Sequence, residues 1–161
     1  MDEIRQKLQR KEITVGDAIV KALPLLRDRV HDDTLTWLAC ELQGYPNGIE
    51  FYQGKATNLP EYRVVTGALK LMDPTGALSD FNHPFASRGK YFLSAPVSWL
   101  EEFASLPGTN ALADCPDLTS LLMKGQGNVV CEFTKPQLNQ VITHIRQRLI
   151  SLLDKMAQKA Q

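Results

Sequence analysis

The sequence predicts an α+β domain that consists of an N-terminal helical hairpin, a small antiparallel sheet and a long C-terminal amphipathic helix. Two N-terminal stretches carry apolar residues at helical spacing, and both end near proline or glycine. Residues 61–72 and 120–133 are rich in β-branched and apolar residues, which is typical of strands. The last stretch repeats apolar residues every three or four positions. At 161 residues, we interpret positions 1–161 as one domain with a sizeable core.

The helical hairpin begins after residue 13. Thr14 and Asp17 have the spacing of a capping box, and an apolar face follows them. Pro24 removes a hydrogen bond and crowds the preceding turn, which predicts a kink or a break. The second helix is expected to be capped by Asp32 or Asp33 and to run to about residue 43. It should end there because Gly44 suits the position after a helix and Pro46 cannot continue one.

The middle of the chain predicts fewer regular elements. Residues 44–60 resemble a loop, and residues 61–72 a strand in which Gly67 marks a bulge. A turn at 73–76 closes this strand, and residues 79–96 read as mostly irregular. The remaining expectations are a short helix from Pro96, capped by Ser94 and carrying Trp99, Leu100 and Phe103, and two strands around residues 125–127.

The final helix has the clearest pattern. Thr134 is its predicted cap, Pro136 lies in its first turn, and Gln137 completes a capping box. Its apolar residues alternate in steps of four and three, which is a heptad seam. The seam and its two flanking arginines are Leu138, Ile142, Ile145, Leu149, Leu152 and Met156, with Arg146 and Arg148. The seam fits either docking on the domain's own core or a helix pair across a homodimer, and both can hold.

The overall composition excludes several classes of protein. Eighteen basic and eighteen acidic residues give zero formal charge, which argues against broad capture of nucleic acid or anionic membrane. The N-terminal residues lack an apolar signal region, and no apolar run could span a bilayer. Three distant cysteines without a C-x-x-C pair predict reduced thiols in a cytoplasmic protein. No cofactor or metal site is expected, since the histidines lack ligand spacing.

One group of residues invites a catalytic interpretation. Asp117, Glu132 and Lys135 resemble the two-carboxylate and lysine pattern of metal-dependent nucleases, in which the acids hold Mg²⁺. The lysine usually lies two residues after the acid, on the same strand face. Here it lies three residues after it, beyond the capping threonine, so it should point elsewhere. We therefore keep a nuclease as an alternative and expect no catalytic residues.

Three stretches occur in an order that resembles the AbiTii domain of bacterial abortive-infection proteins. They are DDTLTWLACELQGYP (32–46), LPEYRVVTGAL (59–69) and THIRQRLISLLDKM (143–156). The resemblance implies a non-enzymatic interaction, oligomerisation or sensor module in anti-phage defence, either free-standing or joined to other domains. It implies a homodimer or homo-oligomer, or an effector protein encoded nearby, as partner. The motif residues it brings forward are Trp37, Glu41, Tyr45, Tyr62 and Arg63.

Glu41 stands out within this motif on physical grounds. An anion in the last turn of a helix opposes the helix dipole, so a compensating group is expected. Arg63 begins the following strand, and its guanidinium fits a carboxylate bidentately. We predict that Glu41 and Arg63 pair with each other and join the helix to the strand. The alternative is that the same residues form a small-ligand pocket centred on Arg63.

Overall fold

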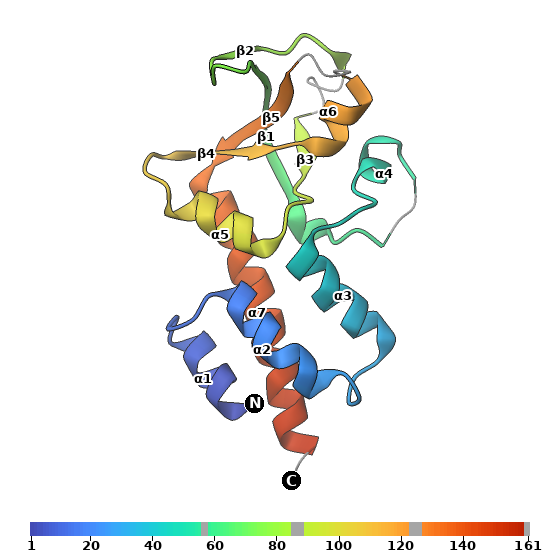
Figure 1. Cartoon of the computed structure of the whole chain (residues 1–161), viewed down its shortest axis with the longest axis vertical. Helices are drawn as coiled ribbons and strands as arrows, with labels where there is room; N and C mark the ends of the chain where they lie inside the picture. The colour runs from blue at the N-terminus through green and yellow to red at the C-terminus, as the bar shows by residue number, and fades with distance from the viewer. Residues whose placement is uncertain (56–57, 85–88, 123–126, 160–161) are drawn as a thin grey trace.

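The computed structural model describes residues 1–161 except 56–57, 85–88, 123–126 and 160–161. A five-stranded antiparallel sheet occupies one half of the molecule, and the N-terminal helices occupy the other (Figure 1). A long C-terminal helix extends from the sheet down through the helical half (Figure 1). The predicted α+β class, with its small antiparallel sheet and long final helix, is confirmed. Among the described residues, no helix combines the length and hydropathy needed to cross a bilayer.

The N-terminal half contains three helices, of which sequence analysis predicted two. They are α1 (Asp2–Gln9), α2 (Val15–Leu26) and α3 (Asp32–Gln43). The cap of α2 is as predicted, because the Asp17 N–H donates to Thr14 Oγ1 at 3.1 Å. Of the kink or break predicted at Pro24, the break is wrong: α2 continues to Leu26, and the proline lies in its last turn.

The predicted cap of α3 at Asp32 or Asp33 is wrong, because the N-cap is His31. Asp32 and Asp33 lie in the first turn, where their charges suit the helix dipole. The predicted end at residue 43 is confirmed. Gly44 follows with a φ of +96°, a conformation that favours glycine. A Cβ added there would also lie 2.9 Å from the carbonyl oxygen of Ser94, so the chain turns tightly against that segment.

The sheet has β1 at its centre. Its strands are β1 (Val64–Met72), β2 (Leu78–Asp80), β3 (Lys90–Phe92), β4 (Asn110–Asp114) and β5 (Asn128–Thr134). The order is β2-β1-β5-β4, and β3 pairs with the first part of β1. The pairing of β1 with β5 is unbroken from Gly67 to Met72, so the predicted bulge at Gly67 is wrong. The glycine instead allows close approach, since a Cβ would lie 2.3 Å from the Glu132 carbonyl oxygen.

Three short elements occupy regions predicted as loop or strand: α4 (Ile49–Tyr52), the 3₁₀ helix η1 (Glu61–Arg63) and α6 (Pro116–Leu122). The short helix predicted from Pro96 is confirmed as α5 (Val97–Ser105). Residues 79–96 contain β3 and most of β2 and are less irregular than predicted. The first of the two strands predicted around 125–127 is wrong, because α6 takes its place, while residues 125 and 126 lie outside the described residues. The N-cap of α5 is Pro96, without a side-chain cap from Ser94.

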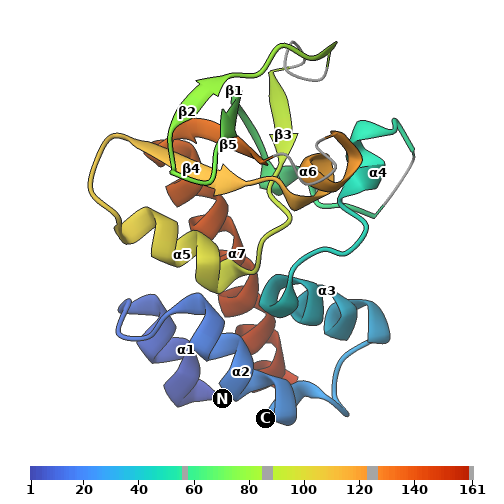
Figure 2. The ribbon, with the colours of Figure 1, turned by 45° about the horizontal axis from the view of Figure 1, so that its top comes forward.

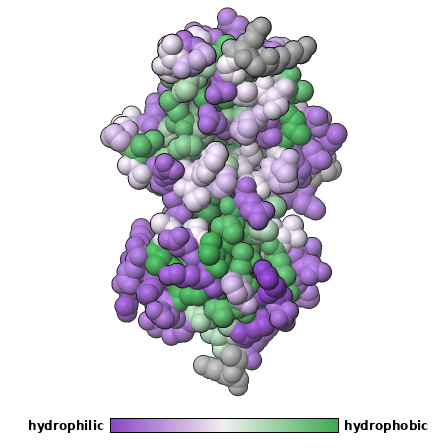
Figure 3. All heavy atoms as spheres, in the orientation of Figure 1, coloured by the Kyte–Doolittle hydropathy of each residue, from purple (hydrophilic) through white to green (hydrophobic). Residues whose placement is uncertain are grey.

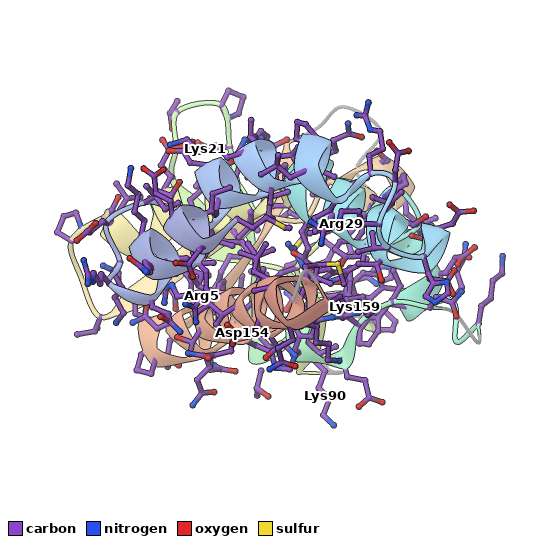
Figure 4. All side chains as sticks on the ribbon, turned by 90° about the horizontal axis from the view of Figure 1, so that it is seen from below. Arg5, Lys21, Arg29, Lys90, Asp154 and Lys159 are labelled. Carbon is purple, nitrogen blue, oxygen red and sulfur yellow. The ribbon has the colours of Figure 1, made fainter. Side chains whose placement is uncertain are left out.

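Helix α7 (Lys135–Lys159) packs against α1, α2, α5 and the sheet (Figures 1 and 2). Gln137 does not form the predicted reciprocal capping box. Its side-chain amide instead exchanges two 2.8 Å hydrogen bonds with the Thr66 backbone and donates to Thr134 Oγ1. Seen along α7, Arg5 of α1 lies beside Asp154 of α7, and the two form an ion pair at 2.9 Å (Figure 4).

The heptad seam of α7 forms part of the chain's own core. Five of its six apolar residues are at most 6 % exposed, and Leu152 is half-buried. The five are Leu138, Ile142, Ile145, Leu149 and Met156. These side chains belong to one apolar cluster with α1, α2, α5 and the sheet. The seam is thus used for docking within the chain, and self-association stays a prediction.

Candidate functional site

Glu41 and Arg63 form a buried ion pair between α3 and η1. Glu41 lies in the last turn of α3, and Arg63 ends the 3₁₀ helix that leads into β1. The Arg63 Nη2 lies 2.5 Å and its Nε 3.1 Å from Glu41 Oε2, and both side chains are fully buried. The predicted pairing is confirmed. A guanidinium in this position supplies the positive charge that the C-terminal end of α3 requires.

Two phenols complete the environment of the Glu41 carboxylate. Tyr45 donates to Glu41 Oε1 at 2.7 Å, and the Tyr62 hydroxyl donates to the same oxygen. The Trp37 indole N–H in turn donates to the Tyr62 oxygen at 2.7 Å. Burial, reinforced by the Glu41 charge, raises the pKa of Tyr62 to about 12 and raises the pKa of Tyr45 further. Both phenols therefore remain protonated donors at neutral pH.

Arg63 also holds the segment that precedes α5. Its Nη1 donates to the carbonyl oxygens of Leu93 and Ala95, both at 2.6 Å. Its guanidinium carbon lies 4.8 Å from the centroid of the Tyr45 ring, which adds a cation–π contact. The cluster of Trp37, Glu41, Tyr45, Tyr62 and Arg63 thus fastens α3, η1 and residues 93–95 to one another.

Helix α7 contacts two aromatic residues of this cluster, Trp37 and Tyr62. The Arg148 guanidinium lies 4.1 Å from the Trp37 ring centroid, and the His144 ring stacks on Tyr62 at 4.1 Å. Arg148 was predicted to flank a dimer seam; here it contacts an aromatic ring of the same chain. His144 was not predicted from the sequence, where its only local signal is its position one helical turn before Arg148.

The arrangement suits a structural role better than ligand binding at Arg63. All three nitrogens of Arg63 donate hydrogen bonds, and no part of its side chain is exposed. A ligand at Arg63 would have to displace Glu41 or two backbone carbonyls, which costs several kcal/mol for a buried charge. The geometry therefore favours the structural interpretation of the pair over a ligand pocket centred on Arg63.

The comparisons with known proteins agree with the sequence motif. The AbiTii family model matches residues 1–161, which is the whole chain. The chain belongs to the AbiTii family. This membership connects the chain to abortive infection, a bacterial defence against phages. No curated protein and no solved structure matches the chain.

Glu132 and Asp117, the two carboxylates of the nuclease alternative, lie on different elements and have different neighbours in this AbiTii fold. Glu132 lies on β5, where it is opposite Ala68 and Leu112 and next to the buried Cys131, which faces the other side of the sheet. Asp117 lies on α6 near Gly48 and Ser94. Within the described ranges, no group of three or more His, Cys, Asp or Glu side chains is placed to hold a metal ion.

Asp117 has an unfavourable position for a charged group. Burial raises its pKa, and a hydrogen bond with Ser94 offsets only part of this effect. A carboxyl whose pKa is higher in the folded than in the unfolded chain binds more protons when folded, so stability falls as pH rises through that window. We expect Asp117→Asn to raise the melting temperature at pH 7 and to leave it unchanged well below the ordinary carboxyl pKa. Thermal unfolding at both pH values, with exposed Glu102→Gln as control, is the measurement; a destabilised Asn variant at pH 7 would contradict it.

Proposed function

We propose that this chain is a non-enzymatic protein-contact module of abortive-infection defence and that it binds another protein of the defence system. Large apolar side chains on two neighbouring helices carry the proposal. Val20 and Leu25 on α2, Trp99 on α5 and Leu106 directly after α5 are 45–54 % exposed. Figure 3 shows hydrophobic residues gathered over α2 on one face of the molecule. Exposed apolar groups that gather on one face are typical of protein-binding surfaces.

Different residues of the chain stabilise the fold and remain exposed for contact, which supports this proposal. Glu41, Tyr45 and Arg63 of the family motif are buried and hold three segments together, so they brace the domain. Most apolar side chains of α2 and α5 are buried in the core, but the four exposed ones named above lie outside the core cluster and are available for contact with a partner. A second copy of this chain could also be the partner. The α7 seam that was predicted to join two copies is, however, already buried in the core. We therefore propose a different protein as the partner.

The test uses the native locus and phage plating. We expect Val20→Gln with Leu25→Gln to abolish protection, because two large apolar contacts are lost, while the purified variant retains its melting temperature. Glu132→Gln, on β5 and outside α2, serves as the control and should protect as well as the wild type. Protection that survives the α2 variant but is lost in Glu132→Gln would reject the contact module and favour the nuclease alternative.

A further inference from the structure

A cavity of about 440 Å³ lies next to the buried Glu41–Arg63 cluster, whose Tyr45 lines it. The end of α3 and the turn after it form one wall, residues 94–96 and α5 form another, and the junction of β4 with α6 closes it. The lining side chains that give the cavity its character are Tyr45, Pro96, Trp99, Phe103, Asp114 and Asp117. The cavity was not anticipated from the sequence, because its walls come from three separate parts of the chain.

The walls of this cavity combine aromatic faces with negative charge. Trp99 and Phe103 are one helical turn apart on α5 and both line the cavity, and Trp99 is 50 % exposed. Asp114 and Asp117 add two acidic residues at the junction of β4 with α6, and no Lys, Arg or His is among the described lining residues. Burial already raises the pKa of Asp117, so a cation placed beside it would relieve an unfavourable charge.

The buried cluster holds one wall of the cavity in place. The Tyr45 N–H donates to the Ser94 carbonyl oxygen at 2.9 Å, which joins the turn after α3 to the segment before α5. Arg63 donates hydrogen bonds to the carbonyl oxygens of Leu93 and Ala95, on either side of Ser94. The Tyr45 hydroxyl donates to Glu41. A preformed wall lowers the entropic cost of binding a partner.

We propose that this cavity receives a lysine or arginine side chain from an extended segment of the partner protein. The cation would lie between the Trp99 face and the carboxylates of Asp114 and Asp117, while its aliphatic stem contacts Phe103 and Pro96. An aromatic face and a carboxylate both attract a cation, and the apolar walls match the methylene stem. This inference rests on the proposed function and deepens it, because it gives the partner a chemical class.

The experiment uses the full chain with ¹⁵N-labelled tryptophan and the blocked peptides acetyl-Gly-Pro-X-Pro-Gly-amide. X is Arg, Lys, Gln or Glu, and the Trp99 indole resonance is followed by NMR; Trp37 serves as an internal reference because it is buried. We expect the Arg and Lys peptides to shift Trp99 and the Gln and Glu peptides to leave it unchanged. The Arg peptide should bind at least about tenfold more weakly to Asp114→Asn with Asp117→Asn, since charge-assisted contacts are lost. Added salt should weaken binding in the same direction.

A matched variant separates the cavity from general surface charge. Glu102→Gln removes an exposed acid from the same helix as Trp99, and we expect it to bind the Arg peptide like the wild type. Equal shifts with Arg and Gln peptides, no shift with any peptide, or unchanged affinity in the Asp114/Asp117 variant would overturn the inference. If the inference fails while Val20→Gln with Leu25→Gln still abolishes protection, the contact module stands without this cavity. If the peptides bind but the α2 variant protects, the cavity stands and the proposed function falls.

Discussion

Replacing Arg63 by methionine is expected to lower the free energy of unfolding by about 3–5 kcal/mol, because it leaves Glu41 as a buried charge without its partner. Both side chains are fully buried, so solvent cannot replace the lost contact. The variant also removes the donor to the carbonyl oxygens of Leu93 and Ala95, which adds unsatisfied buried acceptors. Urea unfolding monitored by circular dichroism measures the loss.

A double-mutant cycle isolates the pair from these secondary effects. Glu41→Gln keeps an oxygen that can accept from Tyr45 and Tyr62, so it removes the charge with little change in shape. We expect Glu41→Gln with Arg63→Met to be less destabilised than the sum of the two single variants. The half-exposed pair Arg5 and Asp154 offers the matched control, with a coupling energy below about 1 kcal/mol. A coupling energy near zero for Glu41 and Arg63 would show that the contact contributes nothing.

The Glu41–Arg63 pair was predictable because the need for a basic partner follows from the local position of Glu41 in its helix. An acid in the last turn of a helix needs compensation, and the family motif contained one basic residue at the start of the following strand. The partners of the pair beyond the motif were not predictable. Arg63 binds the carbonyl groups of Leu93 and Ala95, about thirty residues further along the chain, and carbonyl groups carry no side-chain signal. The cluster's link to the cavity wall is therefore a property of the fold alone.

The missed secondary structure has a similar physical cause. Strands β2 and β3 have three residues each, too few to display a period, and they form because β1 offers hydrogen-bonding partners. Helix α6 lies where a strand was predicted, because a segment as short as residues 116–122 does not distinguish the helical period from the strand period. The long α7 was predicted well, since many turns repeat the same signal.

Replacing Leu149 by alanine is expected to cost about 2–5 kcal/mol, since the side chain is fully buried and its removal leaves a cavity in the core. The heptad pattern alone could not tell whether the seam packs on its own domain or on a second copy, because both require the same spacing. The structure places Ile145 and Leu149 among the core residues of a single chain. Lysine at Ile145 should therefore unfold the domain, rather than separate a folded dimer into folded monomers.

The comparison with Gln147 makes this distinction measurable. Gln147 lies on the exposed face of the same helix, so Gln147→Ala should change the free energy of unfolding by less than about 0.5 kcal/mol. Chemical unfolding of both variants at several protein concentrations is the measurement. If the seam serves only the core, the loss in Leu149→Ala is independent of concentration. A loss that grows with dilution, together with a wild-type dimer by light scattering, would mean that Leu149 stabilises an association between chains and that the core packing of α7 is not its whole role.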